Sequence, residues 1–276
     1  MRIKDEFARD NLTHVAAGIA FYGLLALFPG ISAAISMIGI LIDPTTIMDE
    51  LDRLSAILPR EAAEIILGQA RAVAASGEGR LGFAFFVGLV LAFYSSSKGM
   101  QSLMDGLNMA HNEVETRGIL RRTFLKLGLT MVLISGLLVG VATALILPAI
   151  LTVLGLTEAS GVWVASLRWP LMAILTVAGL RILYWLGPDH KTPHRGLLTW
   201  GTLAATVMWV CASLGFSFYV TNFASYNETF GALGGAIILL MWLWISGLVI
   251  LIGAEIDSMI EAVRNDPTLL DHGKPA

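Results

Sequence analysis

The sequence predicts an all-α integral membrane protein with six transmembrane helices, and three observations lead to this prediction. Only 14% of the residues are charged and 56% are hydrophobic, whereas soluble domains carry about 25% charged residues. Glu228 is the one charged residue between Arg195 and Glu255. The apolar runs on either side of Glu228 each exceed the length of about 20 residues that crosses a hydrocarbon core. We therefore expect residues 1–276 to form a single polytopic membrane domain.

Six nearly uncharged runs give the boundaries of the expected spans. They lie at about 15–42, 81–97, 127–150, 169–187, 197–220 and 231–254. The residues before the first run lack a short apolar core with a cleavage site, so we expect no cleaved signal peptide. In the external segment 43–80, apolar residues recur at helical spacing on both sides of Pro59. This pattern predicts two short amphipathic helices at the external membrane surface.

The distribution of Lys and Arg predicts the orientation. If the N-terminus is cytoplasmic, the cytoplasmic segments contain more than twice as many Lys and Arg residues as the external ones. Positively charged loops favour the cytoplasmic side. Both termini are therefore expected in the cytoplasm.

Pro29 and Gly30 fall near the middle of the first span. Proline has no amide donor, so the carbonyl of Leu25 loses its helical partner. A kinked or broken first helix is the expected result. Two interpretations remain open: a discontinuous helix that lines a substrate path, and an ordinary packed kink.

Polar residues recur after the second span at spacings of three and four residues, which place them on one face of a helix. They are Lys98, Gln101, Asp105, Asn108 and Asn112. This stripe favours a solvated cytoplasmic face, and the inner mouth of a polar cavity is the alternative.

Arg181 is the one basic residue deep within an expected span. It lies roughly 9 Å from the cytoplasmic end of that helix, at a rise of about 1.5 Å per residue. The side chain could extend to the lipid headgroups or form a buried ion pair. For the ion pair, we expect Glu255 as the first partner and Asp105 as the second.

The hairpin between the last two spans collects polar side chains close to the membrane surface. They are Asn222, Tyr226, Asn227 and Glu228. Such groups can satisfy the open backbone groups of two helix ends, and a carboxylate suits the positive end of the following helix. We predict an external hairpin cap, which could also border an opening.

Catalytic and metal-binding patterns find little support. His190 and His194 have the spacing of a metal pair, but Pro188 and Pro193 break the helix that would align them. There is no nucleophile elbow and no phosphate-binding loop. With a net charge of −3, the chain also offers no basic surface for a nucleic acid. We expect no catalytic residue, no metal, no cofactor and no nucleic-acid partner.

Two small-residue features predict packing. Gly136 and Gly140 form a G-x-x-x-G pattern that is typical of close helix contacts. Cys211 is the single cysteine, and we expect it to be a small buried hydrophobic residue.

Several segments together resemble the YihY/BrkB family of bacterial inner-membrane proteins. They are AAGIAFYGLLALFPG at 16–30, SSSKGMQSLMDGLN at 95–108, LRWPL at 167–171, and the stretch 216–257, with its blocks at Tyr226–Gly231 and 253–255. The resemblance implies six transmembrane helices and no established catalytic residues. Some members once carried the label of a transfer-RNA processing ribonuclease, which is regarded as misassigned, and some are linked to lipid traffic in the envelope.

The leading hypothesis is a transporter or lipid-handling protein of the bacterial inner membrane. Its polar cavity would be bounded by the first, second, fourth and sixth helices, and its partners would be membrane lipids. The alternative is a scaffold for envelope machinery, with an envelope protein or a second copy of the chain as partner. A membrane-bound ribonuclease is the remote alternative.

Overall fold

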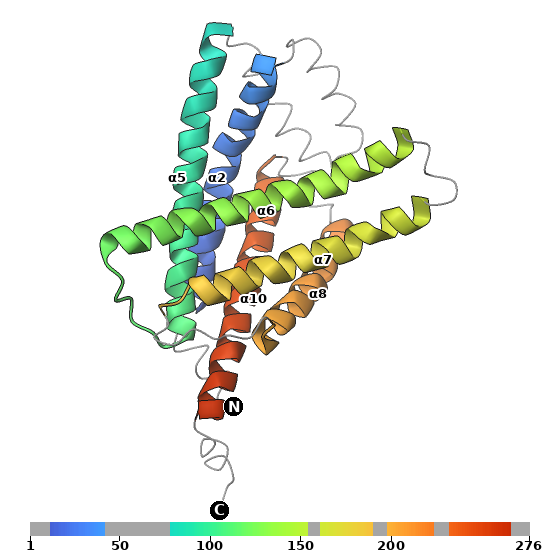
Figure 1. Cartoon of the computed structure of the whole chain (residues 1–276). Coiled ribbons are helices and arrows are strands. Elements are labelled where there is room, and N and C mark those ends of the chain that lie inside the picture. Colours follow the sequence, from blue (N-terminus) through green and yellow to red (C-terminus); the bar gives the residue numbers. More distant parts are fainter. Residues whose placement is uncertain (1–11, 42–77, 154–160, 190–197, 224–231, 266–276) are drawn as a thin grey trace, which may run out of the picture. The chain divides into compact units, whose positions relative to one another are not determined.

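The computed structural model describes residues 12–41, 78–153, 161–189, 198–223 and 232–265. These residues form six α-helices and no strand, which confirms the all-α prediction for the described part (Figure 1). The helices are α2 (Leu12–Leu41), α5 (Glu78–Ala110), α6 (Ile119–Val153), α7 (Gly161–Leu186), α8 (Trp200–Phe223) and α10 (Ala232–Asn265).

Within the described ranges, four helical segments are long and apolar enough to cross a membrane. They are Leu12–Ile31, Ile119–Gly140, Trp200–Val220 and Gly234–Arg264. α7 contributes a shorter apolar segment, Pro170–Leu186. α5 includes the predicted span 81–97, but this helix also carries the polar run from Ser95 to Lys98. Several membrane-spanning helices are therefore supported, while the count of six spans stays a prediction.

Helix boundaries follow local chemistry. α5 ends where Asn112 adopts a φ of 53°, the one positive φ among the described residues other than glycine. Asparagine tolerates this left-handed conformation better than most residues. α8 begins after Thr199, whose hydroxyl accepts a hydrogen bond from the Thr202 amide at 3.2 Å. Thr199 is therefore a side-chain N-cap.

α2 continues as one helix through Pro29, so the helix is not broken there. A bend at Pro29 stays a prediction. A Cβ added to Gly30 would lie 3.8 Å from the Cβ of Ala92 on α5. This contact agrees with an ordinary packed position, and a substrate path along the helix stays a hypothesis.

The chain groups into two compact units, each described by itself. Unit 1 comprises Met1–Val15, Leu103–Cys211 and Leu248–Ala276. Unit 2 comprises Ala16–Ser102 and Ala212–Gly247.

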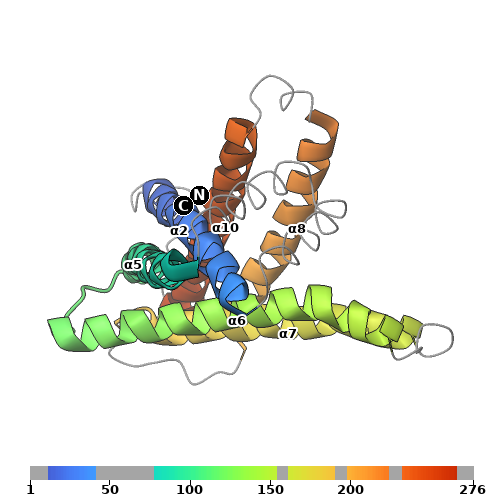
Figure 2. The ribbon, with the colours of Figure 1, turned by 90° about the horizontal axis from the view of Figure 1, so that it is seen from above.

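In unit 2, α2 and α5 run side by side in opposite directions (Figures 1 and 2). An added Cβ on Gly99 would lie 3.5 Å from the Cβ of Tyr22 and 3.9 Å from the carbonyl oxygen of Ile19. The two backbones therefore approach closely at this glycine.

In unit 1, α6 and α7 lie side by side (Figures 1 and 2). The G-x-x-x-G prediction is wrong at its first glycine, because an added Cβ on Gly136 meets no described atom within 4 Å. On Gly140 it would lie 3.9 Å from Leu175, which is an ordinary contact. The burial expected for Cys211 is also wrong, since this side chain is exposed on α8.

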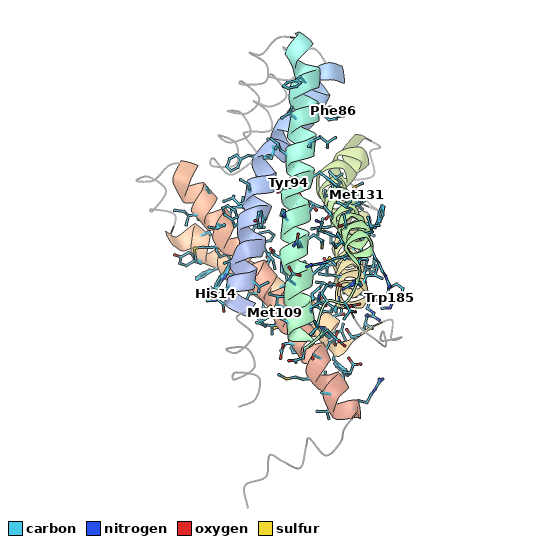
Figure 3. The ribbon with its side chains drawn as sticks, turned by 90° about the vertical axis from the view of Figure 1, so that its left-hand side faces the viewer. His14, Phe86, Tyr94, Met109, Met131 and Trp185 are labelled. Carbon is cyan, nitrogen blue, oxygen red and sulfur yellow. The ribbon has the colours of Figure 1, made fainter. Side chains whose placement is uncertain are left out.

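Large apolar side chains are exposed along the described helices. Examples labelled in Figure 3 are Phe86 and Tyr94 on α5, Met131 on α6 and Trp185 on α7. A soluble protein does not leave so much apolar surface in water. Exposure of these side chains therefore agrees with helices that face lipid.

Candidate functional site

Polar side chains and backbone groups form two clusters among the described residues of unit 1. The first, the Arg117 cluster, consists of Asn108, Glu115, Thr116, Arg117 and Asp189. The second, the Asp257 cluster, consists of Thr199, Gly201, Thr202 and Asp257.

The Arg117 guanidinium is the centre of the first cluster, with only 5% of its side chain exposed. Its Nε donates to Glu115 Oε1 at 2.7 Å and lies 3.3 Å from Asp189 Oδ1. Its terminal nitrogens donate to the carbonyls of Leu186 at 3.2 Å and Gly187 at 2.7 Å. These carbonyls are open because α7 ends there. Arg117 therefore caps α7 from the connector between α5 and α6.

Asn108 and Thr116 complete the cluster. The Asn108 side chain accepts from the Asp189 amide at 2.8 Å and donates to Glu115 at 3.1 Å. Both the amide and the hydroxyl of Thr116 donate to Asp189 Oδ2, at 2.8 and 2.6 Å. The connector, residues 111–118, is thus fixed to the end of α7 by bonds that join distant parts of the chain.

The Thr116 hydroxyl is the main cause of a lowered pKa at Asp189, and the Thr116 amide and the charges of Arg117 and Arg121 act in the same direction. A carboxyl with a lower pKa in the folded state stabilises the fold above its unfolded pKa of about 3.9. This stabilisation is lost as the pH falls through the lowered folded value.

We predict that Asp189→Asn lowers the thermal unfolding temperature in detergent at neutral pH. The difference from the unsubstituted protein should be constant above about pH 5 and shrink below about pH 4. Unfolding temperatures of both proteins across this range measure it. A difference that grows on acidification would contradict this account of Asp189.

The predicted polar stripe does not form one uniform face. Asn108 is buried in the Arg117 cluster, and Asp105 forms an ion pair with Arg122. Gln101 is half-buried, and Lys98 lies over the Tyr94 ring at 5.7 Å from its centroid. The expectation of a fully solvated stripe is therefore wrong at Asn108, because the connector folds back over this residue. A cavity mouth stays a hypothesis.

The Asp257 carboxylate of α10 is the centre of the second cluster, with 7% of the residue exposed. Oδ1 accepts from the Gly201 amide at 2.6 Å, and Oδ2 accepts from the Thr199 hydroxyl at 2.5 Å. The Thr199 and Thr202 hydroxyls lie 2.7 Å apart. A negative charge is favourable at the start of a helix, where amides lack partners. Asp257 therefore caps α8 from another helix.

Glycines allow α8 and α10 to approach this closely. A Cβ on Gly201 would come within 2.1 Å of the Gly253 carbonyl oxygen. A Cβ on Gly253 would come within 2.4 Å of the Tyr184 hydroxyl, which donates to the Ile250 carbonyl at 2.6 Å. Three helices, α7, α8 and α10, thus meet at Gly253.

Glu255 is buried on α10 with 2% of the residue exposed, and Arg181 is half-buried on α7. Their pairing stays a prediction. The second expected partner, Asp105, forms its ion pair with Arg122.

The hairpin cap lies mostly outside the described residues. Asn222 belongs to the last turn of α8, whereas Tyr226, Asn227 and Glu228 are outside the described part, as are His190, His194 and most of segment 43–80. Within the described ranges, no group of three or more His, Cys, Asp or Glu side chains could hold a metal ion.

Sequence reasoning missed Arg117, Asp189, Tyr184, Thr199, Gly201 and Asp257. A signal existed for Thr199, because a threonine before a long apolar run is typical of a helix N-cap. The other residues depend on contacts between distant segments, which no local pattern reports.

Comparison with known proteins gives one family. The profile of the family described as virulence factor BrkB matches residues 3–275. The putative ribonuclease-like protein YfkH of Bacillus subtilis is 27% identical over 277 aligned residues, covering 96% of this chain and 97% of that protein. No solved structure matches.

Longer relatives occur in Xanthomonas. UPF0761 membrane proteins of Xanthomonas campestris pv. campestris and Xanthomonas axonopodis pv. citri are each 28% identical over 271 residues. The alignment covers 95% of this chain but 60% of those proteins, so the chain spans less than two thirds of their length. The family profile nevertheless covers nearly all of the present sequence. This chain belongs to the virulence factor BrkB family.

Proposed function

We propose that this protein is a non-enzymatic, multi-pass protein of the bacterial inner membrane that transports a solute or handles lipid in the cell envelope. Membership of a family with relatives named as membrane proteins supports the membrane part of the proposal. The observation that carries the functional part is the burial of Glu255 within a long apolar helix.

Glu255 lies in the segment Gly234–Arg264 of α10, which is long and apolar enough to cross a membrane. Burying an ionisable group in such a helix is costly, and residues of this kind typically belong to ion, proton or substrate pathways. Asp257 is also buried, but its two oxygens cap α8. The cap gives Asp257 a structural role, so Glu255 is the stronger functional candidate.

The proposed pathway lies along α7 and α10, with Arg181 as the charge that balances Glu255. Both termini are proposed to be cytoplasmic, as the excess of Lys and Arg in the expected cytoplasmic segments favours. A polar cavity between the helices is part of this proposal.

The test uses purified protein in vesicles that carry a fluorescent phosphatidylethanolamine, with dithionite to bleach the label in the outer leaflet. We expect the protein to move label between leaflets faster than protein-free vesicles do. Glu255→Gln should reduce that rate toward the value of protein-free vesicles, while the variant keeps the unfolding temperature of the unsubstituted protein. Glu113→Gln, on the connector, is the matched control and should keep the rate.

Other outcomes separate the alternatives. If the folded protein moves no more lipid than protein-free vesicles do, lipid translocation is wrong and solute transport or a scaffold role gains support. If Glu255→Gln retains the full rate, Glu255 is not part of the pathway. Cleavage of transfer RNA by the purified protein would contradict the non-enzymatic proposal.

A further inference from the structure

We propose that the connector between α5 and α6 and the first turns of α6 together form an interface anchor, a patch that inserts into the headgroup region of the bilayer and binds anionic lipid. The interface anchor consists of Val114, Ile119, Leu120, Arg121 and Phe124. It does not depend on transport, because it rests on the exposure and charge of these residues in unit 1.

The connector has two unlike sides. Its inner side carries Glu115 and Arg117, which the Arg117 cluster holds against the end of α7. Val114, on its outer side, is 76% exposed, and Ile119, the first residue of α6, is 86% exposed, the highest value among the large hydrophobic side chains of the described residues. Leu120 and Phe124 continue this exposed apolar surface on the first turns of α6. The polar contacts therefore fix an apolar surface in place.

The position of the surface indicates lipid as its occupant. Ile119 is the first residue of the segment Ile119–Gly140, which is long and apolar enough to cross the membrane. Val114 precedes it by only a few residues, and the Arg117 cluster prevents the connector from moving away from the helix ends. Exposed apolar surface costs free energy in water in proportion to its area. The half-exposed Trp185 near the end of α7 is of a type enriched at membrane interfaces.

Charge complementarity indicates an anionic headgroup. Arg117 is balanced by Glu115 and Asp189, and Arg122 pairs with Asp105. Arg121 is exposed and lies close enough to Asp189 for its charge to lower the pKa of that carboxyl, but no hydrogen bond or ion pair within the described residues holds its side chain. A guanidinium can donate two parallel hydrogen bonds to a phosphate. Arg121 therefore lies beside the apolar surface as a phosphate-binding group.

The first experiment measures how deeply the interface anchor lies in the bilayer. Spin labels are placed at Val114→Cys or Leu120→Cys in a Cys211→Ser background, and the protein is reconstituted in lipid nanodiscs. We expect collisions with oxygen, which concentrates in lipid, to exceed collisions with a water-soluble nickel chelate at both positions. Glu113→Cys, on the same connector, is the polar control and should show the reverse. Preference for the nickel chelate at Val114 and Leu120 would overturn the proposal, and so would low accessibility to both reagents, which indicates a protein partner.

The second experiment measures how the unfolding temperature depends on the charge of the lipid headgroup. The gain in unfolding temperature on changing from phosphatidylcholine to phosphatidylglycerol nanodiscs should fall by at least half in Arg121→Gln. Arg264→Gln, at the end of α10, is the matched control and should keep the gain. Inorganic phosphate added to the phosphatidylcholine nanodiscs should not reproduce the gain, since the apolar contacts require a lipid. An equal gain in Arg121→Gln and the unsubstituted protein would overturn the anionic part of the proposal.

Discussion

Replacing Gly201 with alanine should destabilise the protein by about 3 kcal/mol, because the added methyl group has no space. The new Cβ would lie 2.1 Å from the Gly253 carbonyl oxygen and 2.5 Å from the Asp257 carboxyl carbon. The nearest atom is backbone, which cannot rotate away as a flexible side chain can. α8 and α10 must therefore separate, and Asp257 would lose its hydrogen bond from the Gly201 amide.

This effect is measured by heating the protein in detergent and monitoring the loss of its monodisperse elution peak. Gly215→Ala is the matched control on the same helix, because a Cβ there meets no described atom within 4 Å. The control should be neutral or slightly stabilising, since alanine is about 1 kcal/mol better than glycine within a helix. Equal unfolding temperatures for the two variants would show that α8 and α10 do not approach as described.

Replacing Arg117 with glutamine should cost about 3–5 kcal/mol, the usual result of removing one partner from a buried ion pair. Glu115 and Asp189 would both lose their contacts with the guanidinium, and the carbonyls of Leu186 and Gly187 would lose their donors. Arg117→Lys should not restore stability, because an ammonium cannot reproduce the planar, multiply donating guanidinium.

Hydrogen exchange distinguishes local release from general destabilisation. In the unsubstituted protein, the amides of Thr116 and Asp189 donate to side chains of the cluster and should be protected. Arg117→Gln should increase exchange in peptides covering 111–118 and 186–189 before it affects α10. The control Arg264→Gln, at the exposed end of α10, should change stability by less than about 0.5 kcal/mol. Rapid exchange of both amides in the unsubstituted protein would contradict the described cluster.

Close helix contacts show the limit of local patterns. The sequence motif at Gly136 and Gly140 predicted a close contact, but an added Cβ meets no described atom within 4 Å at Gly136 and only an ordinary neighbour at Gly140. The tight contact instead involves Gly201 and Gly253, which form no short motif. A small residue permits close approach, but only the partner helix decides whether the approach occurs. The same limit applies to Cys211, because its apolar sequence context did not distinguish the protein interior from a lipid-facing surface.

The sequence by itself determined the all-helical membrane class, because length, low charge and hydropathy act locally along each segment and lipid permits few alternatives. It also singled out Glu255 as a charged residue at the end of an apolar run, and the structure places this residue in the interior. Only the tertiary structure decided the roles of Arg117 and Asp257. Apart from Glu115, which is two residues from Arg117, their partners lie far away in sequence, as with Asp257 and Gly201, which are 56 residues apart. Hydrogen bonds and ion pairs depend on distances between atoms in space, and a one-dimensional pattern of residue types does not contain those distances.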